Sequence, residues 1–583
     1  MKKGLLYIIT TTILSFSACS DGFMDVDPNN FITDESVWQS PSSIEMFISD
    51  TYNSTLTGPL YNYTQFNGDV GGFRGHMAYF CTDDMGEARV GWNGFNFTPS
   101  NCPVNNRWTD CYASIRKTNI ALSKIPGSTV ISEEVKKRYM GDMYFVRGLL
   151  YLELFRYYGG VPLIDKVLDR NKDDIFYSRS TPEQTLEFIV NDFEEAASRL
   201  PVEVADAEYG RATRGAALGM KAVAYLHGAG TVDEKYYSNA ASTAKIFIDG
   251  ELKTRYELFG KNAATAAEKR QAFINLFLEQ YEGNEEVIFD VQYAYPYKTQ
   301  EGLQTIPAPG SPGPGHSYGW GRSAPSDNLA RVFEMKDGSA FDWNNPAHAK
   351  DPFAGRDERF YGTFLYHGVF WKGDYLSLSS NRIENGVEIT DNLPNGLFSS
   401  KSECTQTGYY IRKHMNEPVI SGWDNQLGLG DGGNLIVLRL AEILLIYAEA
   451  QNEVGGPDAT VYEAVNRIRR RAGQPDLPTG LDKDQMRERI FNERRVELAF
   501  ECKRLFDIMR WKKWNAGEKY LNQPLWGVNA RYEKNASGQY ELKYTPFKVF
   551  EGRFVAPKNY LLPIPKNAID QNPKLVNDQN PGW

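Results

Sequence analysis

The chain of 583 residues has no excess of positive charge, and it contains few histidines and few cysteines. Its formal net charge is −10 and its pI is near 5.4, so nucleic acid and anionic lipid surfaces are poor candidate partners. The six histidines are scattered without the spacing of metal ligands, which gives a metal site little support. After the first residues, no stretch reaches the roughly eighteen apolar residues of a membrane helix.

Aromatic side chains, by contrast, are abundant. The chain contains 34 Tyr, 32 Phe and 11 Trp, together 13% of its residues. The hydrophobic share of 42% and the charged share of 24% are ordinary for a soluble globular protein, so a large core is expected. Many aromatic rings must build that core, but a surplus of Tyr and Trp also suits a surface that grips neutral ligands.

The first eighteen residues have the pattern of a targeting signal. Lys2 and Lys3 precede a short apolar run from Leu5 to Phe16, and Cys19 follows two small residues. The pattern predicts a lipoprotein signal, in which the Cys19 thiol is lipidated and becomes the new N-terminus; an ordinary secretory signal with a chance cysteine is the alternative. Cleavage removes two lysines and no acids, so the net charge falls from −10 to −12. The acidic stretch after the anchor resembles signals that send lipoproteins to the cell surface.

Five cysteines remain besides Cys19, so they cannot all form pairs with one another. A disulfide among Cys81, Cys102 and Cys111 is open in an oxidising compartment, but the sequence does not fix the connectivity. Cys502 lies in an apolar stretch and is predicted to be a buried thiol.

Apolar side chains recur three or four residues apart in several stretches, which is typical of helices with one buried face. Within residues 110–158 this pattern predicts two helices, and Gly159, Gly160 and Pro162 end the second. Further helices are expected over 181–200, 212–229, 435–453, 461–472 and, with a break, 485–514. Pairs of helices of this length suggest stacked hairpins of tetratricopeptide type, although the spacing is not a strict repeat.

The remaining segments have no helical period. Residues 286–293 alternate as a strand does, and the Pro/Gly run over 307–315 excludes regular structure. Residues 336–434 are expected to form loops and short strands, where binding sites usually lie. We therefore predict a mainly α fold with a loop-rich part, organised as a signal peptide (1–18), an N-terminal helical region (19–275) and a C-terminal region (276–583) that is loop-rich over 290–434, helical over 435–515 and ends in a tail to 583.

Three motifs invite a catalytic interpretation. Glu442, Glu449 and Glu453 share one helical face, and paired carboxylates serve glycoside hydrolysis. Pairing with nearby arginines is the plainer interpretation, because it lowers a carboxylate pKa whereas an acid catalyst needs it raised. Residues 315–319 match the G-x-S-x-G elbow and residues 428–433 match G-x-G-x-x-G, but neither follows the strand that its motif requires, so both are interpreted as loops.

Short motifs along nearly the whole mature chain resemble the SusD/RagB family in order and spacing. They are the segments 115–119, 147–151, 158–163 and 210–213 in the first half, and 438–443, 447–450, 466–473, 493–498, 504–511, 562–565 and 579–582 in the second. The resemblance implies a SusD-like fold with four tetratricopeptide-like hairpins and a loop-rich ligand-binding part. It also implies a cell-surface lipoprotein that forms the lid of a SusC-like TonB-dependent outer-membrane transporter.

Three segments mix aromatic rings with Asn, Asp or Arg, as glycan capture requires. The expected ligand contacts are Asp83, Arg89, Trp92 and Asn96 in the first, Tyr295 and Tyr297 in the second, and Tyr318 and Trp320 in the third. Tyr293 shares a face with the second pair if the chain stays extended, and core packing is the alternative for each tryptophan. A dense patch of Tyr361, Tyr366, Phe370 and Trp371 is interpreted as a packed strand.

The function that we predict is capture of oligosaccharides or polysaccharide fragments and their delivery to the transporter, without catalysis. A peptide receptor of RagB type, a surface hydrolase and a helical-repeat scaffold are the alternatives. No cofactor is expected, although Asp83 and Asp84 or the loop from Asp424 to Asp431 could hold a structural calcium.

Overall fold

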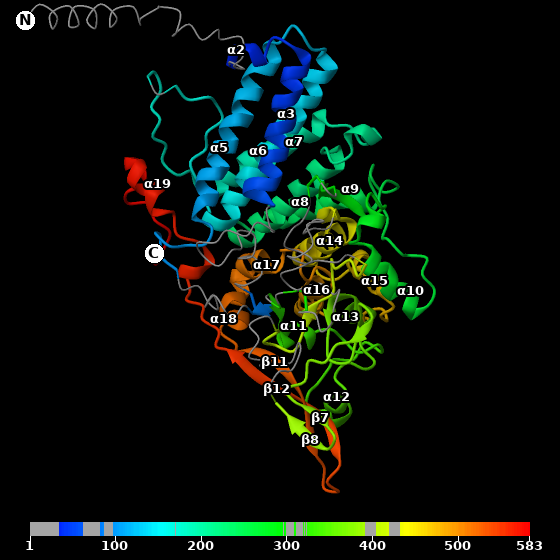
Figure 1. Ribbon diagram of the computed structural model, residues 1–583. Coiled ribbons are helices and arrows are strands. Elements are labelled where there is room, and N and C mark those ends of the chain that lie inside the picture. Colours follow the sequence, from blue (N-terminus) through cyan, green and yellow to red (C-terminus); the bar gives the residue numbers. More distant parts are fainter. Residues whose placement is uncertain are drawn as a thin grey trace, which may run out of the picture.

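The computed structural model describes residues 34–61, 82–86, 97–169, 171–294, 297–298, 308–309, 319, 321, 323–390, 404–418 and 432–583. Helices gather in the upper part of Figure 1, and short strands and loops lie below them, as the predicted mainly α fold requires. The N-terminal helices are α2 (Asp34–Val37), α3 (Pro41–Thr55), α5 (Asn105–Lys124), α6 (Glu133–Tyr158), α7 (Pro182–Arg199), α8 (Arg214–Thr231), α9 (Tyr236–Ile248) and α10 (Ala266–Asn275).

The ends of these helices follow from local hydrogen bonds. Ser132 caps α6 by accepting a hydrogen bond from the backbone N–H of Val135, and Gly159 ends the helix with a φ of 74°. Thr181 and Gln184 form a reciprocal capping box at the start of α7. The helices expected over 110–158, 181–200 and 212–229 are therefore confirmed.

Consecutive helices pack against each other. Helix α6 lies on α7, α7 on α8 and α8 on α9, so the chain forms stacked antiparallel hairpins around one large apolar core. The α6 residues Phe145, Leu150 and Leu154 are fully buried in this core. Within the described residues, no helix combines the length and the apolar character that crossing a membrane requires.

The second helical block is less simple than predicted. Residues 435–439 form strand β10 (Leu435–Arg439), not the start of a helix, and β10 pairs with β2 (Val287–Val291), which confirms the expected strand. The apolar run of four residues from Leu435 to Leu438 is ambiguous between a buried strand and a buried helix, which explains the error. The helices that follow are α14 (Leu440–Gly455), α15 (Ala459–Ala472), α16 (Lys483–Glu497), α17 (Arg504–Arg510) and α18 (Ala516–Leu521).

The loop-rich part carries two-stranded pairs and very short helices. Its elements are β1 (Met85–Gly86), β3 (Ala324–Pro325), α11 (Asp327–Ala330), α12 (Pro346–Lys350), α13 (Glu358–Thr363), β4 (Phe364–Leu365), β5 (Phe370–Trp371), β6 (Asp374–Tyr375), β7 (Arg382–Glu384), β8 (Val387–Ile389) and β9 (Tyr410–Ile411). This arrangement confirms the prediction of loops and short strands over 336–434 for the residues that the structure describes there.

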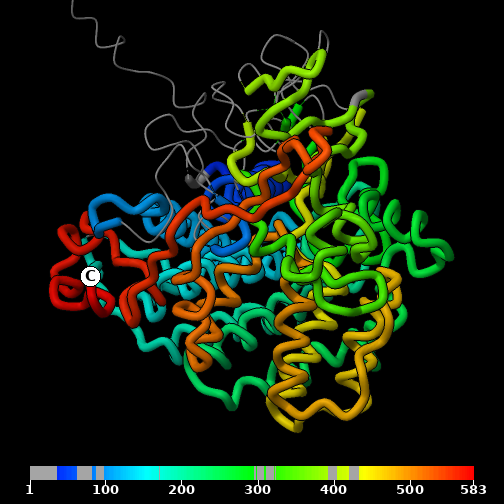
Figure 2. Tube along the Cα trace, turned by 90° about the horizontal axis from the view of Figure 1, so that it is seen from below, coloured from blue at the N-terminus to red at the C-terminus, as the bar shows by residue number. Residues whose placement is uncertain are grey.

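A long hairpin, absent from the sequence prediction, projects at the bottom of Figure 1. It consists of β11 (Leu525–Lys534) and β12 (Tyr540–Phe550), and the short helix α19 (Lys566–Gln571) follows it. The hairpin runs beside the yellow-green loops in the turned view of Figure 2, and Ser379 bridges to Ala530 of β11. It thus braces the loop-rich part along one side.

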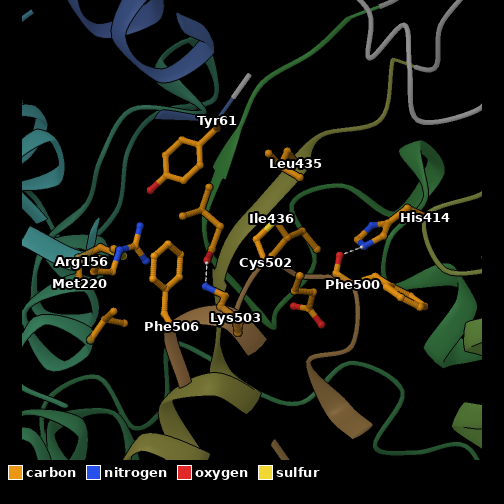
Figure 3. A pocket seen from close by; sticks show the side chains of 13 residues that line it. Tyr61, Arg156, Met220, His414, Leu435, Ile436, Phe500, Cys502, Lys503 and Phe506 are labelled. Carbon is orange, nitrogen blue, oxygen red and sulfur yellow. Dashed lines mark hydrogen bonds between the residues drawn. The ribbon is translucent and has the colours of Figure 1, made fainter. Parts of the chain in front are cut away.

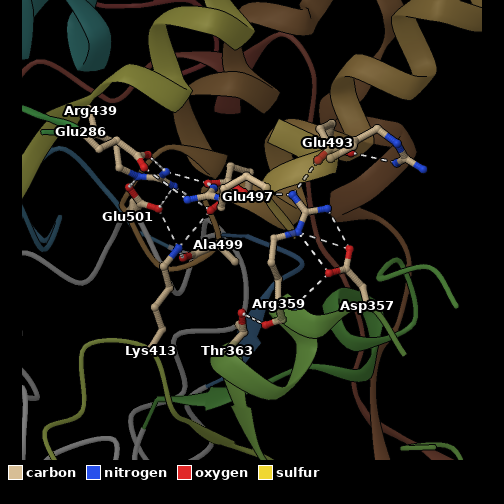
Figure 4. A network of polar contacts seen from close by, with 12 residues as sticks. Glu286, Asp357, Arg359, Thr363, Lys413, Arg439, Glu493, Glu497, Ala499 and Glu501 are labelled. Carbon is tan, nitrogen blue, oxygen red and sulfur yellow. Dashed lines mark hydrogen bonds and ion pairs between the residues drawn. The ribbon is translucent and has the colours of Figure 1, made fainter. Parts of the chain in front are cut away.

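A network of buried ions joins the loop-rich part to the second helical block (Figure 4). Arg439 is fully buried and donates hydrogen bonds to Glu286, Glu497 and Glu501, each with a distance of 2.6 Å. Arg359 of α13 reaches the same Glu497 at 2.9 Å, and Lys413 lies 2.6 Å from Glu501. Segments that are far apart in the sequence therefore meet in one network.

Candidate functional site

Two of the predicted ligand-binding segments are tied together by the strand pair β1–β3. Met85 pairs with Pro325, and Gly86 pairs with Ala324. The Ser326 hydroxyl donates a 2.6 Å hydrogen bond to the carbonyl of Asp83. The segment that leads to Arg89, Trp92 and Asn96 therefore starts beside the segment that follows Tyr318 and Trp320.

Asp83 and Asp84 anchor this pair of segments to the second helical block. The Arg504 guanidinium donates to both Asp83 carboxylate oxygens, at 3.0 and 3.1 Å, and Arg495 Nε lies 2.7 Å from Asp84 Oδ1. Burial alone would raise the pKa of Asp83, but Arg495 and Arg504 outweigh it and hold that pKa below its usual value. With only 6% of its surface exposed, Asp83 is better placed to position the loop than to touch ligand.

The second predicted segment turns sharply after β2. Ala294 and Lys298 exchange backbone hydrogen bonds, so the chain does not stay extended past Tyr293. Tyr293 is buried in the core, whereas Tyr297 is 92% exposed. The condition under which Tyr293 and Tyr297 would share one face is therefore not met. Tyr297 faces solvent, where a ligand can reach it.

The other predicted positions lie outside the described residues. They are the lipid attachment site Cys19 and the ligand contacts Arg89, Trp92, Asn96, Tyr295, Tyr318 and Trp320. The same holds for Cys81 and for most of the two rejected glycine motifs. Cys102 and Cys111 carry free, buried thiols, and burial raises the pKa of Cys102 to about 12. Cys502 is buried, as predicted.

A small cavity lies where the N-terminal helices meet strand β10 and the loop after α16 (Figure 3). Its volume is about 30 Å³, room for one or two water molecules but not for a sugar ring. Arg156 and Lys503 line it, and a hydrogen bond of 3.2 Å joins His414 Nε2 to the carbonyl of Phe500 on one side. This cavity is therefore too small to be the predicted glycan site.

Comparison with known proteins decides the family. The model of the SusD family matches residues 285–583, and a second model, described as starch-binding associating with outer membrane, matches residues 23–226. The chain belongs to the SusD family. A SusD-like protein of Formosa agariphila is 26% identical over 578 residues, which cover 97% of both chains. A SusD-like protein of Bacteroides ovatus is 24% identical over 553 residues, 89% of this chain and 84% of the relative.

Solved structures agree with the SusD-family fold. The crystal structure of a SusD-like protein from Bacteroides fragilis superposes with a TM-score of 0.74 at 27% identity, covering 95% of this chain and 99% of that one. A laminarin-binding SusD-like protein superposes with a TM-score of 0.65 at 19% identity, covering 93% of this chain and all of that one. The predicted family and fold class are both confirmed.

The carboxylates considered for catalysis are all ion-paired in this SusD-family protein. Glu442 lies 2.8 Å from Lys503 Nζ, and Glu449 accepts a 2.7 Å hydrogen bond from Arg510. Glu453 accepts one of 2.8 Å from Arg487. The plainer interpretation, in which these carboxylates pair with cations and hold helices together, is therefore supported.

The structural calcium considered from the sequence would also be bound by acidic side chains. The described residues include no group of three or more His, Cys, Asp or Glu side chains that could hold a metal ion. Asp83 and Asp84 already have cationic partners in Arg495 and Arg504, which weighs against the calcium considered there.

One exposed aromatic feature of the SusD-family chain was missed. Phe370 and Tyr375 are 55% and 69% exposed on the β5–β6 hairpin, although the patch from Tyr361 to Trp371 was interpreted as a packed strand. Tyr361 lies in helix α13, and only Trp371 of the hairpin is packed inside. The signal that could have revealed the hairpin is the dipeptide Lys372-Gly373, which follows Phe370 and Trp371 and precedes Asp374 and Tyr375.

Proposed function

We propose that this protein captures oligosaccharides or polysaccharide fragments at the cell surface and delivers them to a SusC-like TonB-dependent transporter of the outer membrane. It acts by binding and performs no catalysis. The lipid on Cys19 anchors it to the outer membrane. The loops that carry Trp92 and Trp320 hold the ligand, and further contacts come from Arg89, Asn96, Tyr295, Tyr297 and Tyr318.

The pairing of β1 with β3 is the observation that carries this proposal. It pairs residues just before the segment of Arg89, Trp92 and Asn96 with residues just after Trp320, more than two hundred positions away in the sequence. Flat rings beside amide and guanidinium groups suit sugars, whose hydroxyls need donors and whose ring faces are apolar. The matching family model described as starch-binding and the solved relative named for laminarin binding support the same ligand class.

A binding measurement on the soluble chain starting at Ser20 tests the proposal. Isothermal titration with laminarin, soluble starch and other polysaccharides should find one class that binds the unaltered protein. Trp92→Ala or Trp320→Ala should then weaken binding at least about tenfold, because each removes most of a buried aromatic contact.

Phe176→Ala is the matched control, since Phe176 is an exposed aromatic residue on the loop between α6 and α7. It should bind like the unaltered protein, and all variants should melt at similar temperatures. Failure of every polysaccharide to bind would reject the glycan receptor in favour of a peptide receptor. Binding that is indifferent to both tryptophans would reject the site.

The anchoring and delivery parts need a cellular test. Cys19→Ala should move the protein from the outer-membrane fraction to the soluble fraction, and the unaltered protein should co-purify with a transporter of SusC type. A Cys19→Ala variant that stays in the membrane fraction would contradict lipid anchoring.

A further inference from the structure

The β5–β6 hairpin presents two aromatic rings at its tip. Phe370 pairs directly with Tyr375 across the hairpin, and the ring centroids are 5.3 Å apart at an interplanar angle of 72°. The turn residues Lys372 and Gly373 have φ values of 48° and 88°, which match the tight two-residue turn that suits the twist of a hairpin. The pair is therefore fixed in register, with its rings nearly perpendicular.

The two faces of this hairpin differ in an unusual way. Trp371, on the inner face, is only 6% exposed and lies in an apolar cluster with Leu376 and Leu378. Phe370 and Tyr375, on the outer face, expose more than half of their surface. Antiparallel pairs normally place polar side chains on the face toward water, so two large rings there call for a reason other than folding.

The hairpin is braced, which keeps the rings in place. The backbone N–H of Lys372 donates a 3.1 Å hydrogen bond to Glu417, and the Arg412 guanidinium lies 4.6 Å from the centroid of the Trp371 ring. Leu376 and Val369 are joined by a 2.9 Å backbone hydrogen bond at the base of the hairpin. A rigid aromatic surface loses little conformational entropy when a ligand binds to it.

The hairpin adjoins the third predicted ligand-binding segment. Ala308 belongs to the same apolar cluster as Trp371, and the backbone N–H of Gly321 donates a 2.9 Å hydrogen bond to the carbonyl of Ala308. Gly321 directly follows Trp320 in the sequence. The apolar cluster beneath the hairpin therefore includes a residue that is hydrogen-bonded to the segment directly after Trp320, while Phe370 and Tyr375 lie on the outer face of the hairpin.

We propose that Phe370 and Tyr375 form an additional stacking subsite for a neutral glycan chain that extends beyond the contacts of Trp92 and Trp320. The subsite rests on the proposed glycan-receptor function and assigns to it a contact that the sequence patterns did not predict. Two rings offer an area that matches one sugar ring, whereas a stable protein partner needs roughly 800 Å² on each side. Glu417 and Lys372 at the turn supply polar groups of both signs, which favours an uncharged ligand.

Titration calorimetry with polysaccharides and with short oligosaccharides of the same linkage tests this subsite. Laminarin and soluble starch are the first probes. Phe370→Ala with Tyr375→Ala should weaken polysaccharide binding about tenfold, as expected for the loss of one buried ring contact, and should affect the shortest bound oligosaccharides less. Phe370→Leu, which keeps an apolar side chain but not a flat ring, should also weaken binding, whereas Tyr375→Phe should not.

A purely structural role for the pair predicts a different pattern. It would lower the melting temperature of the double variant by no more than about 2 °C and leave its affinity for polysaccharide unchanged. Phe176→Ala again serves as the control. Unchanged polysaccharide affinity of the double variant, with the unaltered protein binding well, overturns this subsite and leaves the glycan receptor intact. If the unaltered protein binds no carbohydrate, the receptor function and the subsite both fail.

Discussion

Buried charges are arranged differently in the two helical blocks. In the N-terminal block they form small groups of two or three inside an apolar core, such as the pair of Arg147 with Asp192 at 2.7 Å. In the second block and the adjoining loops they form larger networks, in one of which Arg439 contacts three carboxylates and Glu497 contacts three arginines. The first block is held mainly by hydrophobic burial, and the second is held to the loops by charge.

The number of cationic partners affects the pKa values of buried carboxylates in the two blocks. Burial raises the pKa of Asp192 to about 6, because the single partner Arg147 does not fully offset the loss of water. Glu501 is just as buried, yet Arg439 and Lys413 outweigh that burial and lower its pKa to about 2. Glu501, with two cationic partners, therefore stays ionised to a lower pH than Asp192, with one. A separate cluster of the same block, in which Arg495 and Arg504 hold Asp83 and Asp84, anchors the start of one of the loops proposed to bind ligand.

Arg439→Met should have the largest effect on stability. Met has a similar length, but its substitution leaves Glu286, Glu497 and Glu501 buried without their shared cation. Removing one side of a buried ion pair costs about 3–5 kcal/mol. We expect a loss of that size in the free energy of unfolding, measured by urea denaturation at neutral pH.

The control for Arg439→Met is an arginine whose ion pairs with carboxylates lie at the surface. Arg470 is half exposed and contacts Glu463 and Asp476 at the surface. Arg470→Met should therefore change the free energy of unfolding by no more than about 1 kcal/mol. Equal effects of the two substitutions would contradict the claim that the buried network joins the loops to the helices.

Leu150→Ala probes the apolar side of the comparison. Leu150 of α6 is fully buried, and deletion of its side chain leaves a cavity that costs about 2–5 kcal/mol. This loss should be the same at pH 7 and at pH 5, since no titrating group is removed. A loss that changes between the two pH values, measured by the same urea titration, would mean that the core of α6 is coupled to a charged group.

The sequence predicted the helices of the first block well because amphipathic period, caps and glycine stops agree locally, as at Ser132 and Gly159. It misplaced residues 435–439 because a short apolar run carries no period that separates strand from helix. The approach of Asp83 to Arg495 and Arg504 joins residues more than four hundred positions apart, and no local pattern encodes such a contact. The exposed ring of Phe370 was missed for a related reason, because which face of a hairpin is covered depends on the rest of the fold.

The smallest expected effect is a difference in pH dependence between the two regions. Glu501 has a folded pKa of about 2, below its ordinary value of 4.5, so the stability that it contributes above pH 4.5 is lost as the pH falls toward 2. Asp192 has a folded pKa of about 6, above its ordinary 3.8, so its protonation adds stability as the pH falls from 6 toward 4. Each slope is at most about 1.4 kcal/mol per pH unit.

Glu501→Gln and Asp192→Asn should separate these two contributions in urea titrations between pH 7 and pH 3. Relative to Glu501→Gln, the unaltered protein should lose stability below pH 4.5; relative to Asp192→Asn, it should gain stability between pH 6 and pH 4. Leu150→Ala, which removes no titrating group, should run parallel to the unaltered protein throughout. Parallel curves for all four proteins would mean that the network and the isolated pair hold their carboxylates in the same way, and the contrast between the two blocks would then rest on their contacts alone.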